Sequence, residues 1–339
     1  MAQKVGIKQI AEQCGVSKTA VSMVLNNRAG VSDSTRERIR RTIGELGYRP
    51  NQAARRLGRG GTTGSKSGML GFLAFDRWAD SGHSYYGQVL AGASLHAQEL
   101  GVGLTYHQVI DPTDAPPDSV DIEALDGLLV TGKPTLGFIE AMRKRSAPIV
   151  VVSPSTPHIQ ADSVRPENIE SAWVATRHLI ELGHTQIGYL GGQSFNADAQ
   201  ERHFGYRLAM QEAGLEVDDD RSVFTDFSPE GGEQGMRELI ERGHPMTAVF
   251  AGGDYLALGA YDAAHHAGLS IPGDLSIVGF DDIEPVRYLR PALTTVHIDL
   301  RAVGARAVDR LMQLITADQS PLRIRVPGEL VLRDSTAPV

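Results

Sequence analysis

The sequence predicts an all-α helix-turn-helix headpiece, followed by a larger α/β body built on parallel sheets. Three observations carry this prediction. Residues 1–68 contain 13 Lys and Arg but only 4 acidic residues, whereas the rest of the chain contains 20 basic and 37 acidic residues. Apolar residues recur at helical spacing through residues 7–46. From Met69 onward, short apolar runs alternate with amphipathic stretches, which is the pattern of repeated βα units.

Length and composition are those of an ordinary globular protein. The 339 residues are enough for two or three domains, and 41% of them are hydrophobic. The start, MAQKVGIKQI, lacks the apolar core of a signal peptide, and no apolar run is long enough to cross a bilayer. The single cysteine, Cys14, cannot form an intrachain disulfide or a cysteine zinc cluster. We therefore expect a cytoplasmic protein without membrane contact, cofactor or metal.

The charge of the N-terminal part predicts a polyanionic partner. Residues 1–68 carry a balance of +9 and the remainder −17, which together give the net charge of −8. Lys and Arg bind duplex DNA by displacing its counterions, so a basic module on an acidic body suits a DNA-binding protein. A disordered basic tail is the alternative, but the helical periodicity favours a folded module.

Two short helices joined by a turn are expected in residues 7–25. The apolar residues of the first helix share one face: Ile7, Ile10, Ala11 and Cys14. Gly15 ends that helix, and Ser17 can cap a second helix that begins at Lys18. With Val21 and Val24 facing inward, four residues of the second helix face outward: Lys18, Thr19, Ser22 and Met23.

A third helix is expected after Ser32 or Ser34, either of which can cap it. It turns three apolar residues inward and ends at Gly47: Ile39, Ile43 and Leu46. Its outer face is rich in arginine. A short helix with a polar outer face beside a basic neighbour is the arrangement that enters a DNA major groove.

A linker is expected in residues 51–68. Residues 51–57 could form two helical turns, but so short a helix needs support from a dimer mate or DNA. Residues 58–68 are almost all Gly, Ser, Thr, Lys and Arg, a composition typical of flexible segments.

The body alternates expected strands with expected helices. Strands are expected at 69–75, 102–109, 126–132, 147–153, 186–192, 222–227, 247–254 and 275–282. Helices are expected at 86–100, 136–145, 170–182, 203–213, 231–242 and 254–267. Repeated βα units form parallel sheets covered on both faces, with ligands at the carboxyl ends of the strands.

Residues 7–57 resemble the headpiece and hinge of the LacI/GalR family of bacterial transcription regulators, and the body resembles the sensor of that family. The motifs that carry the resemblance include GVSKTAVSMVLN, VSDSTRERI, ELGYRPNQAARRL, HLIELGHTQIGYLGG, TAVFAGGD, IVGFDD and PALTTVHID. The resemblance implies an α/β sensor of two doubly wound parallel-sheet lobes, like type I periplasmic binding proteins. It implies a headpiece at 1–50, a hinge and linker at 51–68, and an effector-binding and dimerisation domain at 69–339. The expected lobes are about 69–167 with 297–327, and about 168–296 with 328–339.

The resemblance also implies which residues contact DNA. Lys18, Thr19 and Met23 match positions that read bases, Ser22 matches a phosphate contact, and Leu57 matches a leucine that wedges into a minor-groove step. Two further matching positions complete the DNA-binding set: Asn26 and Arg55. Many members carry Arg where this chain has Met23, so this operator half-site is expected to differ from the common one. The linker after Leu57 is longer than expected for the family.

A set of residues matches the family's effector cleft: Tyr85, Tyr86, Asn196, Asp198, Arg202, Phe227 and Asp281. Residue chemistry independently favours some of them. Arg202 and Asp281 can each hold a pair of neighbouring hydroxyls, and Phe227 or a tyrosine can stack on a sugar. The structural alternatives are an ion pair for Arg202, a cap for Asp281 and a core position for Phe227. Asp254 is expected to cap the helix that follows it.

An enzyme and a carrier are the rival classes. Residues 127–134, GLLVTGKP, match part of a phosphate loop, but Pro134 stands where Ser or Thr binds magnesium, and LLVT is typical of a buried strand. No H-E-x-x-H or G-x-S-x-G motif is present. A sugar-binding carrier of the periplasmic type would share the fold of the body, but the headpiece and the missing signal peptide count against it. We therefore expect no enzymatic activity.

We expect a homodimeric repressor that binds palindromic double-stranded operator DNA and responds to a small molecule. One helix-turn-helix reads only a few base pairs, so specificity requires two of them on a palindrome. Residues 327–335, PGELVLRDS, are strand-like, and no leucine heptads follow them, so we expect dimers rather than tetramers. A saccharide is favoured as effector because Arg202, Asn196 and Asp281 suit several hydroxyls, with a nucleobase or nucleoside as the alternative.

Overall fold

The computed structural model describes residues 11, 13–25, 30–45, 67–75, 85–109, 113–115, 117–118, 120–145, 147–153, 161–316 and 320–339. The chain divides into two compact units, residues 1–67 and 68–339, and each is described by itself. Within the described residues, no helix combines the length and the apolar character needed to span a bilayer.

The first unit is helical. Cys14 is the last residue of a helical segment, and Gly15 takes a positive φ of 61°, as expected for the glycine that ends a helix. Helix α2 (Lys18–Leu25) begins after Ser17, whose Oγ accepts a hydrogen bond of 3.1 Å from the backbone nitrogen of Ala20, so the predicted cap is confirmed. Helix α3 (Asp33–Glu45) follows. The buried core of this unit consists of Ala11, Cys14, Val21, Val24 and Ile39.

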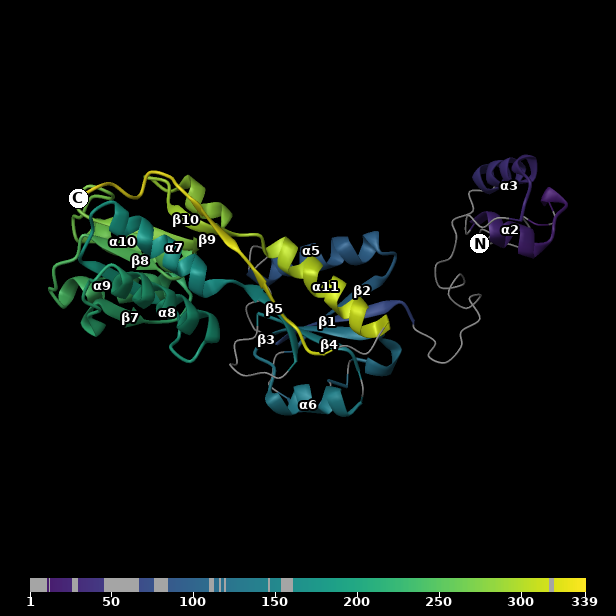
Figure 1. Cartoon of the computed structure of the whole chain (residues 1–339), viewed down its shortest axis with the longest axis horizontal. Coiled ribbons are helices and arrows are strands. Elements are labelled where there is room, and N and C mark those ends of the chain that lie inside the picture. The colour runs from purple at the N-terminus through teal and green to yellow at the C-terminus, as the bar shows by residue number, and fades with distance from the viewer. Residues whose placement is uncertain are drawn as a thin grey trace. The chain divides into compact units, whose positions relative to one another are not determined.

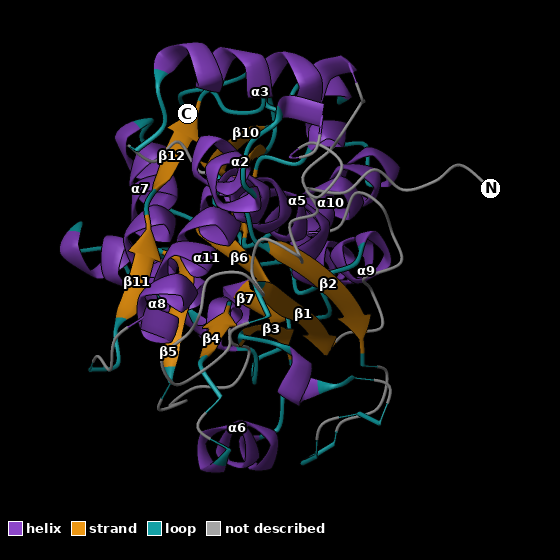
Figure 2. Cartoon of the chain, turned by 90° about the vertical axis from the view of Figure 1, so that its right-hand side faces the viewer, coloured by secondary structure: helices purple, strands orange, loops and turns teal. Residues whose placement is uncertain are grey.

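The first sheet of the body contains six strands, and all of its neighbouring strands pair in parallel. Figure 2 shows its order, from β11 through β5, β4, β3 and β1 to β2. The strands are β1 (Met69–Phe75), β2 (Gly103–Gln108), β3 (Gly127–Gly132), β4 (Ile149–Val152), β5 (Asp162–Pro166) and β11 (Arg323–Val326).

The second sheet also contains six strands, in the order β12, β10, β9, β8, β6, β7. Its pairs are parallel except that of β12 with β10, which is antiparallel. The strands are β6 (Ile187–Gly191), β7 (Ser222–Phe224), β8 (Ala248–Ala251), β9 (Ser276–Asp281), β10 (Thr294–Ile298) and β12 (Gly328–Val331).

Helices cover both faces of each sheet. In the first lobe, α6 (Leu136–Lys144) lies on one face, and α5 (Tyr85–Glu99) with α11 (Leu300–Thr316) lies on the other (Figure 1). In the second lobe, α7 (Asn168–Glu181) and α8 (Ala197–Glu212) cover one face, and α9 (Pro229–Glu241) and α10 (Asp254–His266) cover the other. Alternate residues of β1 follow this division, since Phe72 packs toward α5 and α11 while Leu73 packs toward α6.

The chain passes between the two lobes three times. It crosses between β5 and α7, between β10 and α11, and between β11 and β12. Residues 297 and 298 belong to β10 in the second sheet, although we expected them in the first lobe. After two of these crossings the chain forms a helix that packs on the lobe it has just entered. The helix α7 packs against α8, and α11 packs against α5.

Each of the eight expected strands and six expected helices of the body is present, and residues 127–132 of the phosphate-loop match form the buried strand β3. The eight expected strands and six expected helices leave out β5, β10, β11, β12 and α11, although β12 lies within the strand-like residues 327–335. The strands among these are short and carry polar or charged residues, as in DSVRP of β5 and RIRV of β11, so their sequences lack the apolar run that marks a central strand.

Candidate functional site

The headpiece presents exposed polar residues at the start of α2. Lys18 and Thr19 are exposed, and Met23 is half-buried against Gly30, where a Cβ would lie 3.4 Å from its Sδ. Ser22 lies on the same helix. The remaining DNA-binding candidates lie outside the described residues: Asn26, Arg55 and Leu57.

Helix α3 adds positive charge beside α2. Arg38, Arg40 and Arg41 are exposed, while Ile39 between them is fully buried. The prediction of an arginine-rich outer face over an apolar inner face is therefore confirmed for this helix. Such a surface matches the charge of a phosphate backbone.

Arg202 and Asp281 form a buried ion pair in the second lobe. Arg202 Nη2 lies 3.1 Å from Asp281 Oδ1, and Nη1 donates to the carbonyl of Gly252 at 2.7 Å. The guanidinium lies 3.8 Å from the centroid of the Phe280 ring. Burial acts to lower the pKa of Arg202, but Asp281 raises it above its ordinary value, and burial raises the pKa of Asp281. Arg202 and Asp281, the effector candidates that residue chemistry favoured, thus bind each other. The ion pair that we named as the structural alternative for Arg202 is therefore present.

The backbone at Asp281 has an unusual conformation. Asp281 and Asp282 have φ values of 109° and 56°, in the left-handed region that residues other than glycine rarely adopt. The Asp282 side chain is held by Arg333 Nη2 at 2.5 Å and by Arg287 Nη2 at 2.9 Å. Strain of this kind persists only where surrounding contacts impose it, and it is concentrated at functional sites.

Asp254 supplies further contacts beside this strained segment. Its Oδ2 accepts a hydrogen bond of 2.9 Å from the backbone nitrogen of Ile283, and its Oδ1 accepts one of 2.6 Å from Thr295 Oγ1. The expectation that Asp254 caps α10 is wrong, because Gly253 occupies the cap position and the Asp254 carboxylate is used elsewhere. This fully buried carboxylate instead anchors the chain two residues after Asp281.

Phe227 lies beside the ion pair. The centroid of its ring is 5.9 Å from Arg202 Cζ. A Cβ added at Gly192 would come within 2.1 Å of the ring, and one at Gly253 within 3.0 Å. Glycines at the ends of β6 and β8 therefore make room for the aromatic side chain. Sequence reasoning missed them, although the doublets in YLGG and FAGGD were a signal.

Two tyrosines of the first lobe begin α5. The Tyr85 hydroxyl lies 2.6 Å from Ser153 Oγ, at the end of β4, where Ser153 also has a positive φ of 45°. Burial, and next the charge of Asp198, raise the pKa of Tyr85 well above its ordinary value. The Tyr86 ring packs edge-on against Tyr85 with centroids 5.1 Å apart. The structure thus brings Tyr85 into electrostatic contact with the second lobe.

Asn196 and Asp198 lie at the start of α8. Asn196 is the cap of this helix, since its Oδ1 accepts hydrogen bonds from the backbone nitrogens of Asp198 at 2.8 Å and Ala199 at 3.2 Å. Asp198 Oδ1 accepts from Arg165 Nη2 at 2.5 Å and from Asn168 Nδ2 at 2.8 Å. Asp198 therefore joins the second lobe to β5 of the first.

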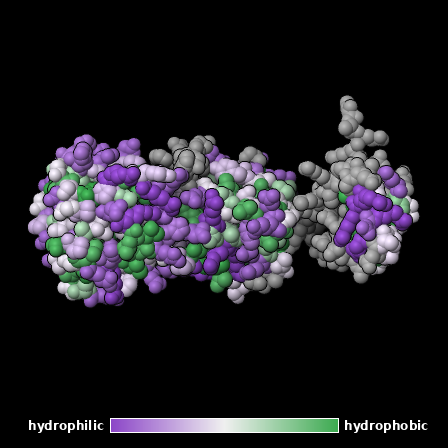
Figure 3. Space-filling model, turned by 90° about the horizontal axis from the view of Figure 1, so that it is seen from above, coloured by the Kyte–Doolittle hydropathy of each residue, from purple (hydrophilic) through white to green (hydrophobic). Residues whose placement is uncertain are grey.

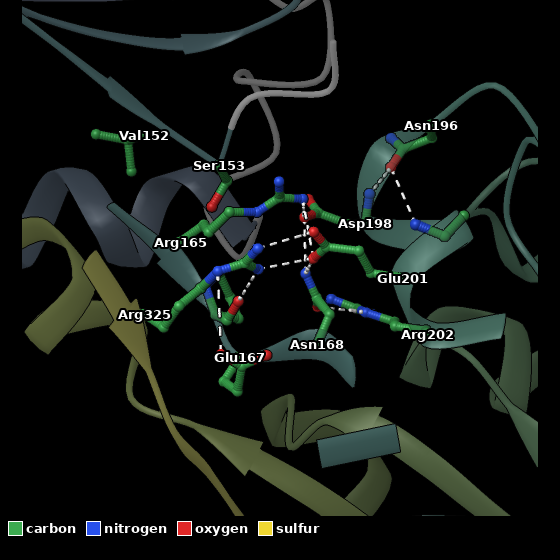
Figure 4. A network of polar contacts seen from close by, with 12 residues as sticks. Val152, Ser153, Arg165, Glu167, Asn168, Asn196, Asp198, Glu201, Arg202 and Arg325 are labelled. Atoms are coloured by element: carbon green, nitrogen blue, oxygen red, sulfur yellow. Dashed lines mark hydrogen bonds and ion pairs between the residues drawn. The ribbon is translucent and has the colours of Figure 1, made fainter. Parts of the chain in front are cut away.

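Sequence reasoning missed most of a polar network that connects the lobes, here called the interlobe network: Arg165, Asn168, Asp198, Glu201 and Arg325. Figure 4 shows Arg165 and Arg325 pointing at the carboxylates of α8. Arg325 Nη1 and Nη2 lie 2.8 and 3.0 Å from the two oxygens of Glu201, and Arg165 Nη2 lies 3.3 Å from Glu201 Oε2. Burial acts to raise the pKa of Glu201, but Arg325 and Arg165 hold it below its ordinary value.

No group of three His, Cys, Asp or Glu residues arranged to hold a metal ion occurs in the part of the chain that the structure describes. The site combines carboxylates, guanidiniums, hydroxyls and the aromatic rings of Phe227, Tyr85 and Tyr86. This set of groups suits the recognition of a polar organic molecule by hydrogen bonds and stacking.

Comparisons with known proteins agree with this architecture. Residues 6–51 match the family described as bacterial regulatory proteins, lacI family, and residues 176–336 match a periplasmic binding protein-like domain. The chain is 34% identical over 340 residues to the transcriptional repressor PurR of Yersinia pestis (strain Pestoides F), covering 98% of this chain and 96% of that protein. This chain belongs to the LacI family.

Solved structures resemble this LacI-family chain along nearly its whole length. The lac repressor dimer bound to operator and the anti-inducer ONPF matches with a TM-score of 0.75 and 26% identity, over 99% of this chain and 100% of that one. A complex of the transcriptional regulator CelR with cellobiose matches with a TM-score of 0.71 and 26% identity, over 98% and 99%. The predicted headpiece and two parallel-sheet lobes are thereby confirmed. The LacI-family chain is a DNA-binding transcriptional regulator, and these relatives are regulators rather than enzymes.

Proposed function

We propose that this regulator is a homodimeric repressor whose affinity for a palindromic operator is controlled by a small saccharide bound between the two lobes. It acts in the cytoplasm, where it meets the chromosome. The observation that carries the effector part is the buried Arg202–Asp281 pair beside the half-buried Phe227 ring. Ligand binding that changes the arrangement of the lobes shifts the population of molecules able to bind DNA.

A saccharide fits the chemistry of these groups. Asp281 and Asp198 retain lone pairs that accept hydrogen bonds from hydroxyls, and Phe227 offers an apolar face to a sugar ring. The solved complex of CelR with cellobiose gives a precedent in a related chain. A nucleobase or nucleoside is the second candidate, because a purine can also stack on Phe227.

DNA contact is assigned to the outward residues of α2, with support from α3. Lys18 and Thr19 are exposed there, and the related lac repressor has been solved as a dimer on its operator. The other proposed contacts are Ser22, Met23, Asn26, Arg55 and Leu57. Because Met23 offers only apolar contact, the half-site it reads is proposed to differ from one read by Arg at the same place.

Dimerisation is assigned to the first lobe. Leu95 and Leu100, at the end of α5, and Tyr106, on the edge strand β2, are 57%, 47% and 43% exposed. Figure 3 shows hydrophobic and hydrophilic residues side by side on the face of the molecule that it displays. A second copy of this chain is the proposed occupant of the apolar positions, and sedimentation of Leu95→Asp as a monomer would support it.

The effector and operator assignments are tested together on the full chain. Selection from random duplex DNA should return a palindrome. Binding of the full chain to that palindrome should weaken steeply with salt and on Lys18→Ala.

A thermal-shift screen of saccharides, nucleosides and purines should then find a stabilising ligand. Asp281→Ala should weaken that ligand at least several-fold in calorimetry, because a buried polar group left unpaired costs about 1–3 kcal/mol. A purine as the only binder would overturn the saccharide assignment.

A further inference from the structure

Glu201 is the shared partner of two arginines that reach it from the first lobe. Its two oxygens lie 2.8 and 3.0 Å from the terminal nitrogens of Arg325, in a bidentate arrangement. Arg165 Nη2 lies 3.3 Å from the same carboxylate, and Asn168 Nδ2 donates to it at 3.1 Å (Figure 4). The Glu201 side chain is 18% exposed. It therefore sits between two positive charges in a largely buried place.

Each guanidinium between the lobes already faces carboxylate oxygens. Arg202 is paired with Asp281, as described above. Arg165 is paired with Asp198 as well as with Glu201. The second neighbour of Arg325 is Glu167, whose Oε2 lies 3.9 Å from Arg325 Nε. These three arginines thus face four carboxylates, and the local balance of formal charge is negative.

The acceptor and donor atoms that these ion pairs do not use favour a ligand that donates hydrogen bonds. Both hydrogen bonds to the Asp198 side chain end on Oδ1, so among the described residues Oδ2 receives none and remains an acceptor. Arg165 Nε is buried and has no partner within the described part of the chain. A hydroxyl can donate to a carboxylate oxygen and can also accept from a guanidinium nitrogen.

An anionic ligand is in a different position. It must approach arginines whose charge a carboxylate already balances, and separating a buried ion pair leaves an uncompensated charge behind. It must also approach four carboxylates in a region where water screens charges poorly. A neutral polyol separates no buried ion pair and is not repelled by the carboxylates.

We infer that Glu201, through Arg165 and Arg325, determines the charge of the effector: the site between the lobes accepts an uncharged polyhydroxyl ligand and excludes its phosphorylated or carboxylated counterparts. This inference rests on the proposed binding of an effector between the lobes. It assigns the choice of ligand charge to residues other than Arg202 and Asp281, the pair that lies beside Phe227. It also separates sugars from sugar phosphates, and nucleosides from nucleotides.

Inorganic phosphate is the probe for a direct test on the full chain. By calorimetry the parent protein should show no saturable phosphate binding, with a Kd above about 10 mM, because a carboxylate already balances the charge of each of the three arginines. Glu201→Gln keeps the shape of the side chain but removes its charge, and it should gain at least tenfold in phosphate affinity. Phosphate binding by the parent in the low millimolar range, or no gain in Glu201→Gln, would overturn the inference.

A matched control removes the same charge elsewhere. Glu233 pairs with Arg237 on the surface of α9, where the arginine side chain is 57% exposed, so Glu233→Gln should leave phosphate affinity unchanged. An equal gain in both variants would mean that the overall charge of the protein, and not Glu201, sets the effect. If thermal melting shows that Glu201→Gln is unfolded, Asp198→Asn, which removes the negative charge that faces Arg165, takes its place with the same expected direction.

Matched ligand pairs complete the test. Cellobiose, glucose and ribose, and glucose 6-phosphate and ribose 5-phosphate, are titrated into the parent and the variant. The uncharged member should bind the parent more tightly, and a phosphorylated member that binds it more tightly would refute the inference. Absence of binding by every uncharged sugar would contradict the proposed saccharide effector, whereas tighter binding of a phosphorylated member contradicts the inference alone, so the two failures are distinct.

Discussion

The two lobes of the body share one strand order but place different residues at the ends of their strands. The order β2, β1, β3, β4, β5, β11 in the first sheet corresponds to β7, β6, β8, β9, β10, β12 in the second. At the end of β4 Ser153 has a positive φ, and at the end of β9 both Asp281 and Asp282 have one. The same place in the scaffold therefore carries a hydroxyl in one lobe and a carboxylate in the other.

This difference shows how a repeated scaffold obtains an asymmetric site. The second lobe holds its charged pair, Arg202 and Asp281, entirely within itself. The first lobe contributes Tyr85 and Ser153 beside it, and its arginines come from the strands at the other edge of its sheet, β5 and β11. The Arg202–Asp281 pair of the second lobe is thus fixed before the lobes meet, whereas the ion pairs of the first lobe's arginines depend on contact between the lobes.

Arg202→Met should give the largest effect because it breaks the internal pair of the second lobe. It leaves the carboxylate of Asp281 and the carbonyl of Gly252 without their buried donor, so the free energy of unfolding should fall by about 3–5 kcal/mol. Urea denaturation measures this change. The matched variant in the first lobe is Ser153→Ala, which removes a neutral hydrogen bond to Tyr85 and should cost about 1 kcal/mol. Equal losses in the two variants would contradict the asymmetry.

Most strands of the fold were predictable because their signal is local. Runs such as MLGFLAF in β1 and IVVV in β4 are buried on both faces of a sheet, and such strands have continuous apolar sequences. β5 and β11 were not predictable in this way. Arg165 in β5 is 91% buried by partners in another lobe, and a single charged residue in a short segment gives no sign of such burial.

The site was predictable only in part, for a related reason. Arg202, Asp281 and Phe227 were proposed from their motifs and their chemistry, and the structure brings them together. Glu201 and Arg325 were missed, since they lie 124 residues apart and meet only because the chain crosses between the lobes three times. Pairing between distant segments leaves no periodic signal in either of them.

The lobes are also expected to respond differently to acid. In the second lobe, the His203 ring stacks on Tyr206 with centroids 5.9 Å apart and contacts Tyr189 at 4.7 Å, and burial lowers the pKa of His203 to about 4. Burial also lowers the pKa values of His178 and His184. Because the folded state disfavours their protonated forms, the stability they contribute is present above about pH 6.5 and is lost as the pH falls through their lowered folded-state pKa values, which for His203 is about 4.

His203→Phe measures this acid effect, which should be the second largest. Between pH 7 and pH 4.5 the parent should lose about 2 kcal/mol through His203 alone, and the variant, which keeps an aromatic ring in the stack, should not lose this part. Urea denaturation at the two pH values gives the difference. The same pH slope in parent and variant would remove His203 from the acid response.

His96 in the first lobe should show the smallest effect, and one of opposite sign. Its Nε2 lies 2.7 Å from Asp309 on α11 and its Nδ1 lies 3.1 Å from Glu99, and these contacts, that with Asp309 first, raise the pKa of His96. A raised folded-state pKa means that the stabilisation is present below about pH 6.5 and is lost as the pH rises through the higher folded value. The Asp309 side chain is 54% exposed, so water screens the pair and the loss should be only about 0.5 kcal/mol. His96→Gln should therefore flatten the stability profile between pH 6 and pH 9 while leaving the acid slope of the second lobe unchanged. A flattened acid slope in this variant would show that the two lobes do not titrate independently, and the contrast between them would then fail.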